Sequence, residues 1–292
     1  MKTSSRILDP RSRAANSPRG RCALGVMTKE PRAGASKTRL VPPLTHEEAA
    51  RLSVAFLCDT AANVADACAD SSRDARATHP VAVYTPDGAE SAFDRLLPSN
   101  FALLAQRGDT LGERLFHASA DLLRLGYESC CLIDADSPTL PRSLLTAAVA
   151  ELGRPGDRLV LGPAEDGGYY LIGVKRAHRR LFDEIAWSTG EVLTRTIERA
   201  REIDLDVEVL PAWYDVDDAS TLRRLCDELF DAVDIGRGGV EHGESHACDA
   251  TRLIPYPAPR TRDELARLLR AEGRARLLPD SLNLRAREKG IA

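Results

Sequence analysis

The feature that most constrains the fold of this chain is an alternation of short apolar runs with longer segments of helical spacing. The expected strands cover residues 22–27, 81–85, 101–105, 129–133, 159–161, 169–174 and 207–210, and the expected helices cover residues 45–64, 111–125, 144–152, 191–200 and 219–230. Strands joined by helices of this length form a mostly parallel sheet that is covered on both faces. The chain is therefore predicted to have an α/β fold in which ligands bind at the carboxyl ends of the strands.

Length and charge limit the domain organisation and the possible partners. The 292 residues suffice for one large domain with tails, and we expect a flexible tail at residues 1–20, a folded domain at 21–230 and a C-terminal extension at 231–292. A capping box at Thr261-Arg-Asp-Glu264 predicts a helix in that extension, after a glycine-rich linker at 236–239. The formal net charge of -4 gives no overall basic field, so a nucleic-acid partner is not expected.

The compartment is predicted from targeting signals and cysteine usage. No apolar run approaches the length of about 18 residues that spans a bilayer, and the N-terminus lacks the apolar run of a signal peptide. Seven cysteines are scattered without a CxxC pair, which is typical of reduced thiols in a core. We therefore expect a cytoplasmic protein with no membrane partner.

The segment after the first expected strand, residues 29–40, is suited to binding phosphate. Its glycine permits close backbone approach, and its lysines and arginines can make charge-assisted hydrogen bonds. The predicted phosphate-binding residues are Lys29, Gly34, Lys37, Thr38 and Arg39, and Lys37 is also a candidate catalytic residue. The GxxxxGK[ST] pattern of a Walker A loop is absent. A solvated basic loop would have the same composition, so both interpretations remain open.

Two aspartates follow the expected strand at 129–133. Asp134 and Asp136 lie two residues apart, where carboxylate oxygens could bind Mg²⁺ or Mn²⁺ and bridge the cation to a diphosphate. Aspartate before Ser-Pro also commonly caps a turn, which is the alternative interpretation.

A third segment, residues 162–173, places two acids before a glycine pair and a strand. Gly167 and Gly168 would let an acceptor lie against the backbone beside Tyr169, and Asp166 could orient a hydroxyl group or act as a base. An Asp-Gly-Gly turn between two strands of a hairpin explains the same residues without a ligand.

Three aspartates, Asp215, Asp217 and Asp218, follow the last expected strand, and each could cap the next helix or bind a metal ion. Asp218 is best placed to cap the following helix, which leaves Asp215 and Asp217 as candidate metal ligands.

Two further segments have both a functional and a structural interpretation. Gln106 and Arg114 could contact the base or sugar of a nucleotide, although capping of a helix by Asp109 or Thr110 explains much of that segment. Trp187 could contact an acceptor, although a tryptophan ahead of a Ser/Thr cap more often packs in a core.

Taken in order, these motifs resemble the glycosyltransferase-A-like transferases often encoded beside radical-SAM and selenium-domain proteins. The match runs from about residue 24 to residue 225 and rests on the motifs at residues 29–40, 106–114, 136–141, 162–173 and 213–217. The resemblance implies a three-layer α/β/α, Rossmann-like nucleotide-diphospho-sugar transferase fold with a mostly parallel mixed sheet. That family usually has a small residue where this chain has Asp134, so Asp136 is the safer metal ligand.

Residues 37–45 together with Asp59 also look like the opening of 2-phospho-L-lactate guanylyltransferase and, more distantly, of molybdenum cofactor guanylyltransferase. The two resemblances leave two reactions open. In glycosyl transfer, a nucleotide-diphospho-sugar donates its sugar to an acceptor. In nucleotidyl transfer, a nucleoside triphosphate donates its nucleotidyl group to a phosphorylated acid.

We expect a metal-dependent transferase that uses a nucleotide-activated small-molecule donor and a small-molecule acceptor, with glycosyl transfer as the leading hypothesis. Lys37 and Arg39 would bind phosphates, Asp136 and Asp217 the cation, and Asp166 the acceptor or its proton. A non-catalytic nucleotide-binding module, which would need no carboxylate cluster, is the non-enzymatic alternative. The oligomeric state stays open.

Overall fold

The computed structural model describes residues 6–11, 22–71, 78–231, 253–270 and 274–277, and the chain groups into two compact units. The sheet unit comprises Met1–Glu30, Thr60–Asp215 and Ile254–Tyr256, and the helical unit comprises Pro31–Asp59, Val216–Leu253 and Pro257–Ala292. Residues of the predicted single domain therefore fall in both units. The predicted linker at 236–239 lies outside the described residues.

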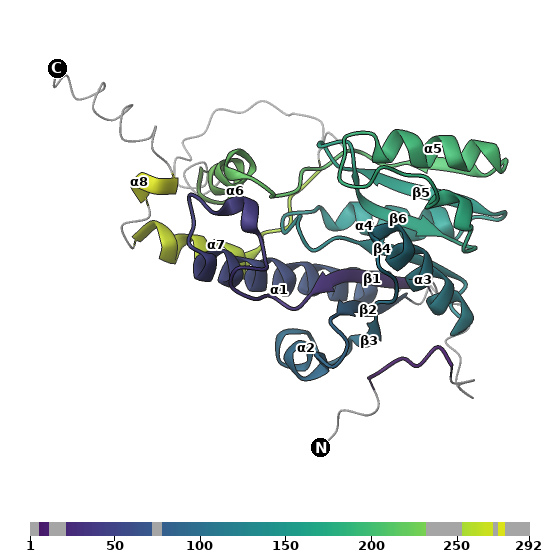
Figure 1. The fold of residues 1–292 in the computed structure, drawn as a ribbon, viewed down its shortest axis with the longest axis horizontal. Helices are drawn as coiled ribbons and strands as arrows, with labels where there is room; N and C mark the ends of the chain where they lie inside the picture. Colours follow the sequence, from purple (N-terminus) through teal and green to yellow (C-terminus); the bar gives the residue numbers. More distant parts are fainter. Residues whose placement is uncertain (1–5, 12–21, 72–77, 232–252, 271–273, 278–292) are drawn as a thin grey trace, which may run out of the picture. The chain divides into compact units, whose positions relative to one another are not determined.

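One seven-stranded sheet forms the centre of the sheet unit (Figure 1). Its strands are β1 (Cys22–Lys29), β2 (Thr78–Thr85), β3 (Ala102–Ala105), β4 (Ser129–Ile133), β5 (Arg158–Pro163), β6 (Tyr169–Val174) and β7 (Asp206–Val209), in the order β3-β2-β1-β4-β6-β5-β7. All seven predicted strands are present. β4 and β6 have the predicted bounds because they are almost completely buried apolar runs whose ends coincide with polar or glycine-rich segments.

The directions of the strands decide where the loops lie. β1 pairs in parallel with β2 and β4, β2 with β3, and β5 with β7, whereas β6 is antiparallel to both β4 and β5. Within this sheet, β6 is therefore the one strand that runs in the opposite direction. The carboxyl ends of the other six strands and the amino end of β6 meet at one edge, which we call the strand-end edge.

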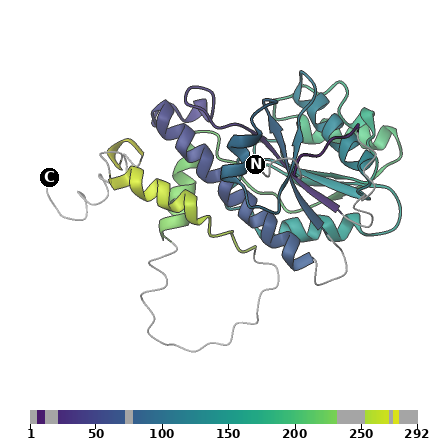
Figure 2. The same cartoon turned by 90° about the horizontal axis from the view of Figure 1, so that it is seen from below.

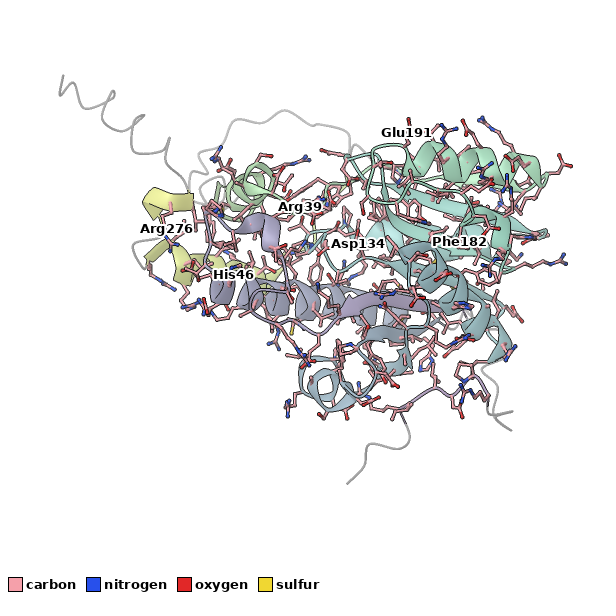
Figure 3. All side chains as sticks on the ribbon, in the orientation of Figure 1. Arg39, His46, Asp134, Phe182, Glu191 and Arg276 are labelled. Carbon is pink, nitrogen blue, oxygen red and sulfur yellow. The ribbon has the colours of Figure 1, made fainter. Side chains whose placement is uncertain are left out.

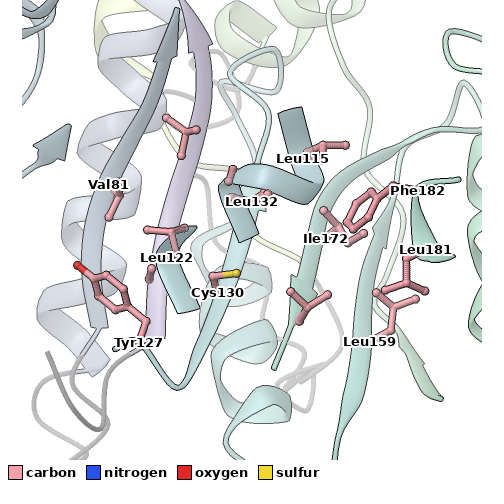
Figure 4. Close-up of a cluster of buried hydrophobic side chains, with 14 of the residues drawn as sticks. Val81, Leu115, Leu122, Tyr127, Cys130, Leu132, Leu159, Ile172, Leu181 and Phe182 are labelled. Atoms are coloured by element: carbon pink, nitrogen blue, oxygen red, sulfur yellow. The ribbon is translucent and has the colours of Figure 1, made fainter. Parts of the chain in front are cut away.

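Helices α3 (Leu111–Arg124) and α5 (Val192–Glu202) cover one face of the sheet. Figure 4 shows the core on this face, where Leu115 and Leu122 of α3 pack with strand residues such as Leu132 and Ile172. Phe182 belongs to the same cluster and approaches the ring of Phe116 edge-on. Alternate strand residues supply this core, as the two-residue period of a strand requires.

The second face is covered by α2 (Glu90–Leu96), α4 (Arg142–Leu152) and the second half of α1 (His46–Ser71) (Figure 2). Phe93 of α2 packs on Tyr84 of β2, and a Cβ added at Gly173 of β6 would lie 3.0 Å from Leu152 of α4. The Asn63 side chain of α1 donates a hydrogen bond to the Leu140 carbonyl just before α4. The sheet unit thus has the three α/β/α layers that were predicted.

The helical unit contains the short helix η2 (Thr38–Leu40), the first part of α1, α6 (Ala219–Asp231), α7 (Pro259–Leu268) and α8 (Arg274–Leu277). The predicted capping box at the start of α1 is confirmed, since Thr45 and Glu48 exchange backbone-to-side-chain hydrogen bonds. The second predicted capping box is wrong. Helix α7 begins at Pro259, and Asp59 accepts the Thr261 N–H instead of a side chain within the helix.

Residues 6–11 differ from the predicted flexible tail. Ile7 forms a β-bridge with Leu103 of β3, and the Arg6 guanidinium donates to the Phe101 and Pro98 carbonyls and pairs with Asp94. These contacts cover the outer side of β3, which is the first strand in the order across the sheet. The rest of residues 1–20 lies outside the described residues.

Burial agrees with the prediction for the cysteines. The cysteines within the described ranges are all buried: Cys22, Cys58, Cys68, Cys130, Cys131 and Cys226. Cys248 lies outside these ranges. Among the described helices, one stretch of α1, His46–Asp70, is long and apolar enough to cross a membrane, and 67% of its most apolar window is buried inside the protein.

Candidate functional site

The strand-end edge of the sheet unit collects most of the predicted acidic and substrate-binding residues. Asp134 and Asp136 follow β4, and Lys29 is the last residue of β1. Asp166 lies in the turn between β5 and β6, and Asp215 follows β7. The β5–β6 turn lies at this edge because it follows the carboxyl end of β5, as expected for loops that follow strands.

Asp134 organises the turn that presents Asp136. The Asp134 N–H donates to the Tyr170 carbonyl at 3.1 Å, which extends the pairing of β4 with β6 by one residue. The Asp136 N–H donates to Asp134 Oδ1 at 3.0 Å. Burial and the nearby Asp134 carboxylate raise the pKa of Tyr170 above its ordinary value. Asp134, which is labelled in Figure 3, therefore caps this turn and holds the backbone N–H of Asp136.

The turn at Asp166 is a tight hairpin turn, as the structural alternative predicted. The Gly168 N–H donates to Asp166 Oδ1 at 2.8 Å, and the Ala164 N–H donates to the Gly168 carbonyl. Gly167 has a φ of +92°, and a Cβ there would lie 2.2 Å from the carbonyl oxygen of Gly190. The hairpin does not remove the functional interpretation, because the Asp166 side chain is exposed at the strand-end edge.

The chain after β7 is tied to the same turn. Ala164 forms a β-bridge with Trp213, and the Glu165 N–H donates to the Trp213 carbonyl at 3.1 Å. The Tyr170 hydroxyl donates to the Pro211 carbonyl at 3.0 Å. These bonds hold the backbone two residues before Asp215 beside the β5–β6 turn, so Asp215 belongs to the strand-end edge.

Trp187 is held against the start of α3. A Cβ added at Gly112 would lie 2.6 Å from Trp187 Nε1, so the indole ring rests directly on the helix backbone. Sequence reasoning missed the roles of Gly112 and Gly190, which allow these close approaches. The signal was a glycine inside or just before a helix, where it is unfavourable unless another group needs the space.

Gln106 and Arg114, predicted to contact a nucleotide, both make structural hydrogen bonds. The Gln106 amide donates to the carbonyls of Thr28 and Val83 at 3.1 Å and 2.8 Å, and thereby links β1 to β2. The Arg114 guanidinium donates to the Gly108 carbonyl at 3.0 Å.

The structural interpretation of this segment is confirmed in part. Thr110 caps α3 and forms a capping box with Glu113.

Tyr169, the first residue of β6, was predicted to contact the acceptor. Its hydroxyl is buried beside Thr196, and burial raises the pKa of Tyr169.

The helical unit contains the predicted phosphate-binding residues Gly34, Lys37, Thr38 and Arg39. Gly34 has a φ of +75° with open space where a side chain would be. Lys37 Nζ donates to Asp217 Oδ1 at 2.9 Å and to the Val216 carbonyl at 2.8 Å. Arg39 lies 3.7 Å from the second oxygen of Asp217. Two predicted phosphate ligands are thus paired with a predicted metal ligand.

Asp218 has the role that the sequence predicted for it. Its carboxylate accepts the backbone N–H groups of Ser220 and Thr221 at 2.8 Å and 2.9 Å, which caps α6. These hydrogen bonds, with that of Thr221 the largest cause, lower the pKa of Asp218. The confirmed cap separates the structural acid of this segment from Asp215 and Asp217.

The strand-end edge offers carboxylate oxygens as potential ligands of a hard cation. Within the described part of the chain, no group of three or more His, Cys, Asp or Glu side chains could hold a metal ion by itself. Mg²⁺ is usually held by one or two carboxylates together with substrate phosphates and water. The Asp134–Asp136 turn supplies hard oxygen donors of that kind, so these residues fit such an ion.

Comparison with known proteins places the fold. Residues 68–189 match the family model described as "Uncharacterized protein conserved in bacteria (DUF2064)". No curated protein matches the chain. Among solved structures, the chain is similar to a "putative nucleotide-diphospho-sugar transferase" from Desulfovibrio desulfuricans G20, with 28% sequence identity and a TM-score of 0.63, over 85% of this chain and 97% of that one.

The chain also has more remote similarities to solved structures of a synthase and a cytidylyltransferase. One is 4-diphosphocytidyl-2C-methyl-D-erythritol synthase from Anaerococcus prevotii DSM 20548, with 12% identity, a TM-score of 0.42, and coverage of 75% of this chain and 97% of that chain. Another is a cytidylyltransferase from Leptospira borgpetersenii serovar Hardjo-bovis (strain JB197), with 9% identity, a TM-score of 0.44, and coverage of 77% and 100%. The similarity to the Desulfovibrio protein confirms the predicted resemblance: the chain has a nucleotide-diphospho-sugar transferase fold.

Proposed function

We propose that this protein is a metal-dependent transferase that moves a sugar from a nucleotide-diphospho-sugar to a small-molecule acceptor. The observation that carries the proposal is the gathering of Asp134, Asp136, Asp166 and Asp215 at the strand-end edge. Ligands of open α/β sheets bind at this edge. The similarity to the Desulfovibrio protein, which covers nearly all of that chain, supports a nucleotide-activated donor.

Asp136, on the backbone that Asp134 fixes, would hold Mg²⁺ or Mn²⁺, and Asp215, at the same edge of the sheet, is a further candidate ligand. When bound, such a cation neutralises the negative charge that develops on the leaving diphosphate. Asp134 keeps one oxygen on the Asp136 N–H, so its main contribution is to position Asp136.

Within the helical unit, Lys37 and Arg39 stay the proposed phosphate-binding residues, because ammonium and guanidinium groups make charge-assisted hydrogen bonds to phosphate oxygens. Asp166, exposed in the β5–β6 turn, would accept the proton of the acceptor hydroxyl. The acceptor oxygen then bonds to the anomeric carbon, the bond from that carbon to the phosphate oxygen breaks, and a nucleoside diphosphate leaves.

Nucleotidyl transfer is the second candidate, and the number of cations in residues 29–39 is compatible with it. Residues 29–39 carry Lys29, Arg32, Lys37 and Arg39, a number of cations that suits a triphosphate at least as well as a diphosphate. In this reaction the acceptor phosphate attacks the α-phosphorus of a nucleoside triphosphate, and pyrophosphate leaves.

Product analysis distinguishes these reactions without knowledge of the acceptor, because water replaces the acceptor at a low rate in many transferases. The purified full chain is incubated with Mn²⁺ or Mg²⁺ and with a panel of nucleotide-diphospho-sugars and nucleoside triphosphates. Released nucleotides and pyrophosphate are then separated by chromatography. We expect nucleoside diphosphate from one donor sugar nucleotide. Pyrophosphate from a triphosphate would replace glycosyl with nucleotidyl transfer, and ligand binding without any product would indicate a non-catalytic module.

A further inference from the structure

The ion pair between Lys37 and Asp217 joins residues 180 positions apart in the sequence, both within the helical unit. The Lys37 side chain is only 7% exposed, whereas Asp217 is 40% exposed and Arg39 is 71% exposed. The ammonium is therefore enclosed and the carboxylate is reachable from solvent. An incoming anion meets Asp217 and Arg39 before it meets Lys37.

Several contacts fix this arrangement. Lys37 has a left-handed backbone with φ +48° immediately before η2, which is an unusual conformation for a residue other than glycine. Its ammonium lies 5.5 Å from the centre of the Phe56 ring of α1. The Asp217 N–H donates to the Thr221 hydroxyl at 3.1 Å, so the backbone of Asp217 is anchored to the start of α6. Strained backbone is maintained where surrounding contacts determine it, often at functional sites.

The charges of these side chains limit which anion can bind. Lys37 and Arg39 contribute two positive charges and Asp217 one negative charge, so the carboxylate compensates one of these two positive charges. A singly charged anion that displaced Asp217 would replace one negative charge with another and gain little. A diphosphate or triphosphate carries several negative charges and can contact both cations at once.

We propose that Asp217 is the internal counter-ion of Lys37 and Arg39, which multiply charged phosphates displace on binding and which singly charged anions do not. This role rests on the proposed function, which supplies a nucleotide as the source of the phosphates. It also changes the role of Asp217, which the sequence analysis had assigned to the metal. A counter-ion weakens phosphate binding and increases selectivity, whereas a metal ligand strengthens binding in the presence of the cation.

The test uses inorganic pyrophosphate as the probe and calorimetric titration of the full chain in a buffer with EDTA. The variant Asp217→Asn keeps an oxygen that can accept the Lys37 hydrogen bond and removes the charge. We expect it to bind pyrophosphate about fivefold more tightly than the wild type, as removal of one charge near 4 Å in a solvated setting implies. Its affinity for the singly charged anion nitrate should rise by a larger factor, because nitrate no longer has to displace a negative charge, so its selectivity for pyrophosphate should fall.

Matched variants identify the source of the gain. Asp263→Asn removes the same charge from an exposed position on α7 in the same unit and should leave the affinity unchanged. Lys37→Gln should weaken binding, and most of the gain from Asp217→Asn should disappear in the Lys37→Gln background. If the Asn variant does not fold, Asp217→Ser, which is smaller and also uncharged, allows the same gain in pyrophosphate affinity to be measured.

Equal or weaker pyrophosphate binding by the Asp217 variants would overturn the counter-ion role, as would an absence of binding in both wild type and variants. The two proposals fail in different ways. A gain in affinity with no product from any donor would contradict the proposed function alone. Product formation with no gain in affinity would contradict the counter-ion alone.

Discussion

The predicted carboxylates of the sheet unit and the predicted phosphate-binding cations of the helical unit, Lys37 and Arg39, are held in place differently. In the sheet unit, Asp134 and Asp166 each accept a backbone N–H from two residues further along the chain. In the helical unit, Lys37 is held by the carboxylate of Asp217. A carboxylate held by its own turn keeps its negative charge for a ligand, whereas a lysine held by an aspartate has much of its charge already satisfied. The carboxylates of the sheet unit are therefore positioned before a ligand binds, whereas Lys37 becomes available to a phosphate only when the phosphate displaces Asp217.

The largest expected effect tests the carboxylates of the sheet unit. Asp136→Asn should lower turnover of the donor identified by product analysis by about a thousandfold, near the upper range for loss of one group that stabilises transition-state charge. Asp134→Asn should have a smaller effect, because asparagine can still accept the Asp136 N–H.

The matched control is Asp206→Asn, which removes an exposed carboxylate at the amino end of β7, away from the strand-end edge. Its turnover should equal that of the wild type. If Asp136→Asn also retained wild-type turnover, the metal-binding role of Asp136 would be wrong.

The comparison also shows what a sequence can predict. The bounds of β4 and β6 follow from unbroken buried runs, and the Asp134 and Asp166 turns follow from local spacing. The Lys37–Asp217 pair depends on a tertiary contact, and no local pattern encodes it. The same holds for α7, which begins at Pro259 beside Asp59.

Other features could not be predicted because they are short or shared between segments. Helix α2 was missed because its seven residues span only two turns between proline-containing segments. The role of Gly112 required knowledge that Trp187, far along the chain, packs on it.

A glycine substitution tests how tightly the turn at Asp166 is built. Gly167→Ala should lower the free energy of unfolding by about 3 kcal/mol, because the new Cβ combines a positive φ with a clash against the backbone of Gly190. Gly156→Ala separates the two causes. Gly156 has a φ of +88° but open space, so its substitution should cost about 1 kcal/mol. Denaturant unfolding that gave equal losses for both variants would show that the close approach at Gly167 relaxes freely.

In the helical unit, the contribution of Asp59 to the free energy of unfolding should depend on pH. Burial raises the pKa of Asp59 above its ordinary value of 3.8, against the lowering effect of hydrogen bonds from the Thr261 and Arg260 N–H groups. A raised folded-state pKa contributes stability that is present at low pH and lost as pH rises through that pKa.

The excess stability of the wild type over Asp59→Asn should therefore decrease as pH rises from 3.8 through the raised pKa, and level off above it. Denaturant unfolding at a series of pH values measures this difference. An excess that grew with pH would show that the hydrogen bonds from α7 outweigh burial.

The smallest effect is expected for an exposed ion pair of the helical unit. Arg276 of α8 pairs with Glu48 at the start of α1 and is the first cause of the lowered pKa of Glu48. Because exposed pairs contribute little, Arg276→Gln should lower the free energy of unfolding at neutral pH by less than about 1 kcal/mol.

That loss should disappear as pH falls through the lowered pKa of Glu48, since a depressed carboxyl pKa stabilises the fold above it. Arg195→Gln, which breaks a local pair on α5 of the sheet unit, is the reference. A much larger loss for Arg276→Gln would show that α8 is essential to the helical unit.

If the strand-end edge binds a nucleotide through a divalent cation, the cation should strengthen nucleotide binding only while Asp136 is intact. Calorimetric titration of the wild type, Asp136→Asn and Asp206→Asn with the nucleoside diphosphate of the active donor, with and without Mn²⁺, measures this difference. We expect Mn²⁺ to tighten binding to the wild type and Asp206→Asn by at least about tenfold and to have little effect on Asp136→Asn. An equal gain from Mn²⁺ in all three proteins would show that Asp136 does not hold a cation that bridges to the nucleotide.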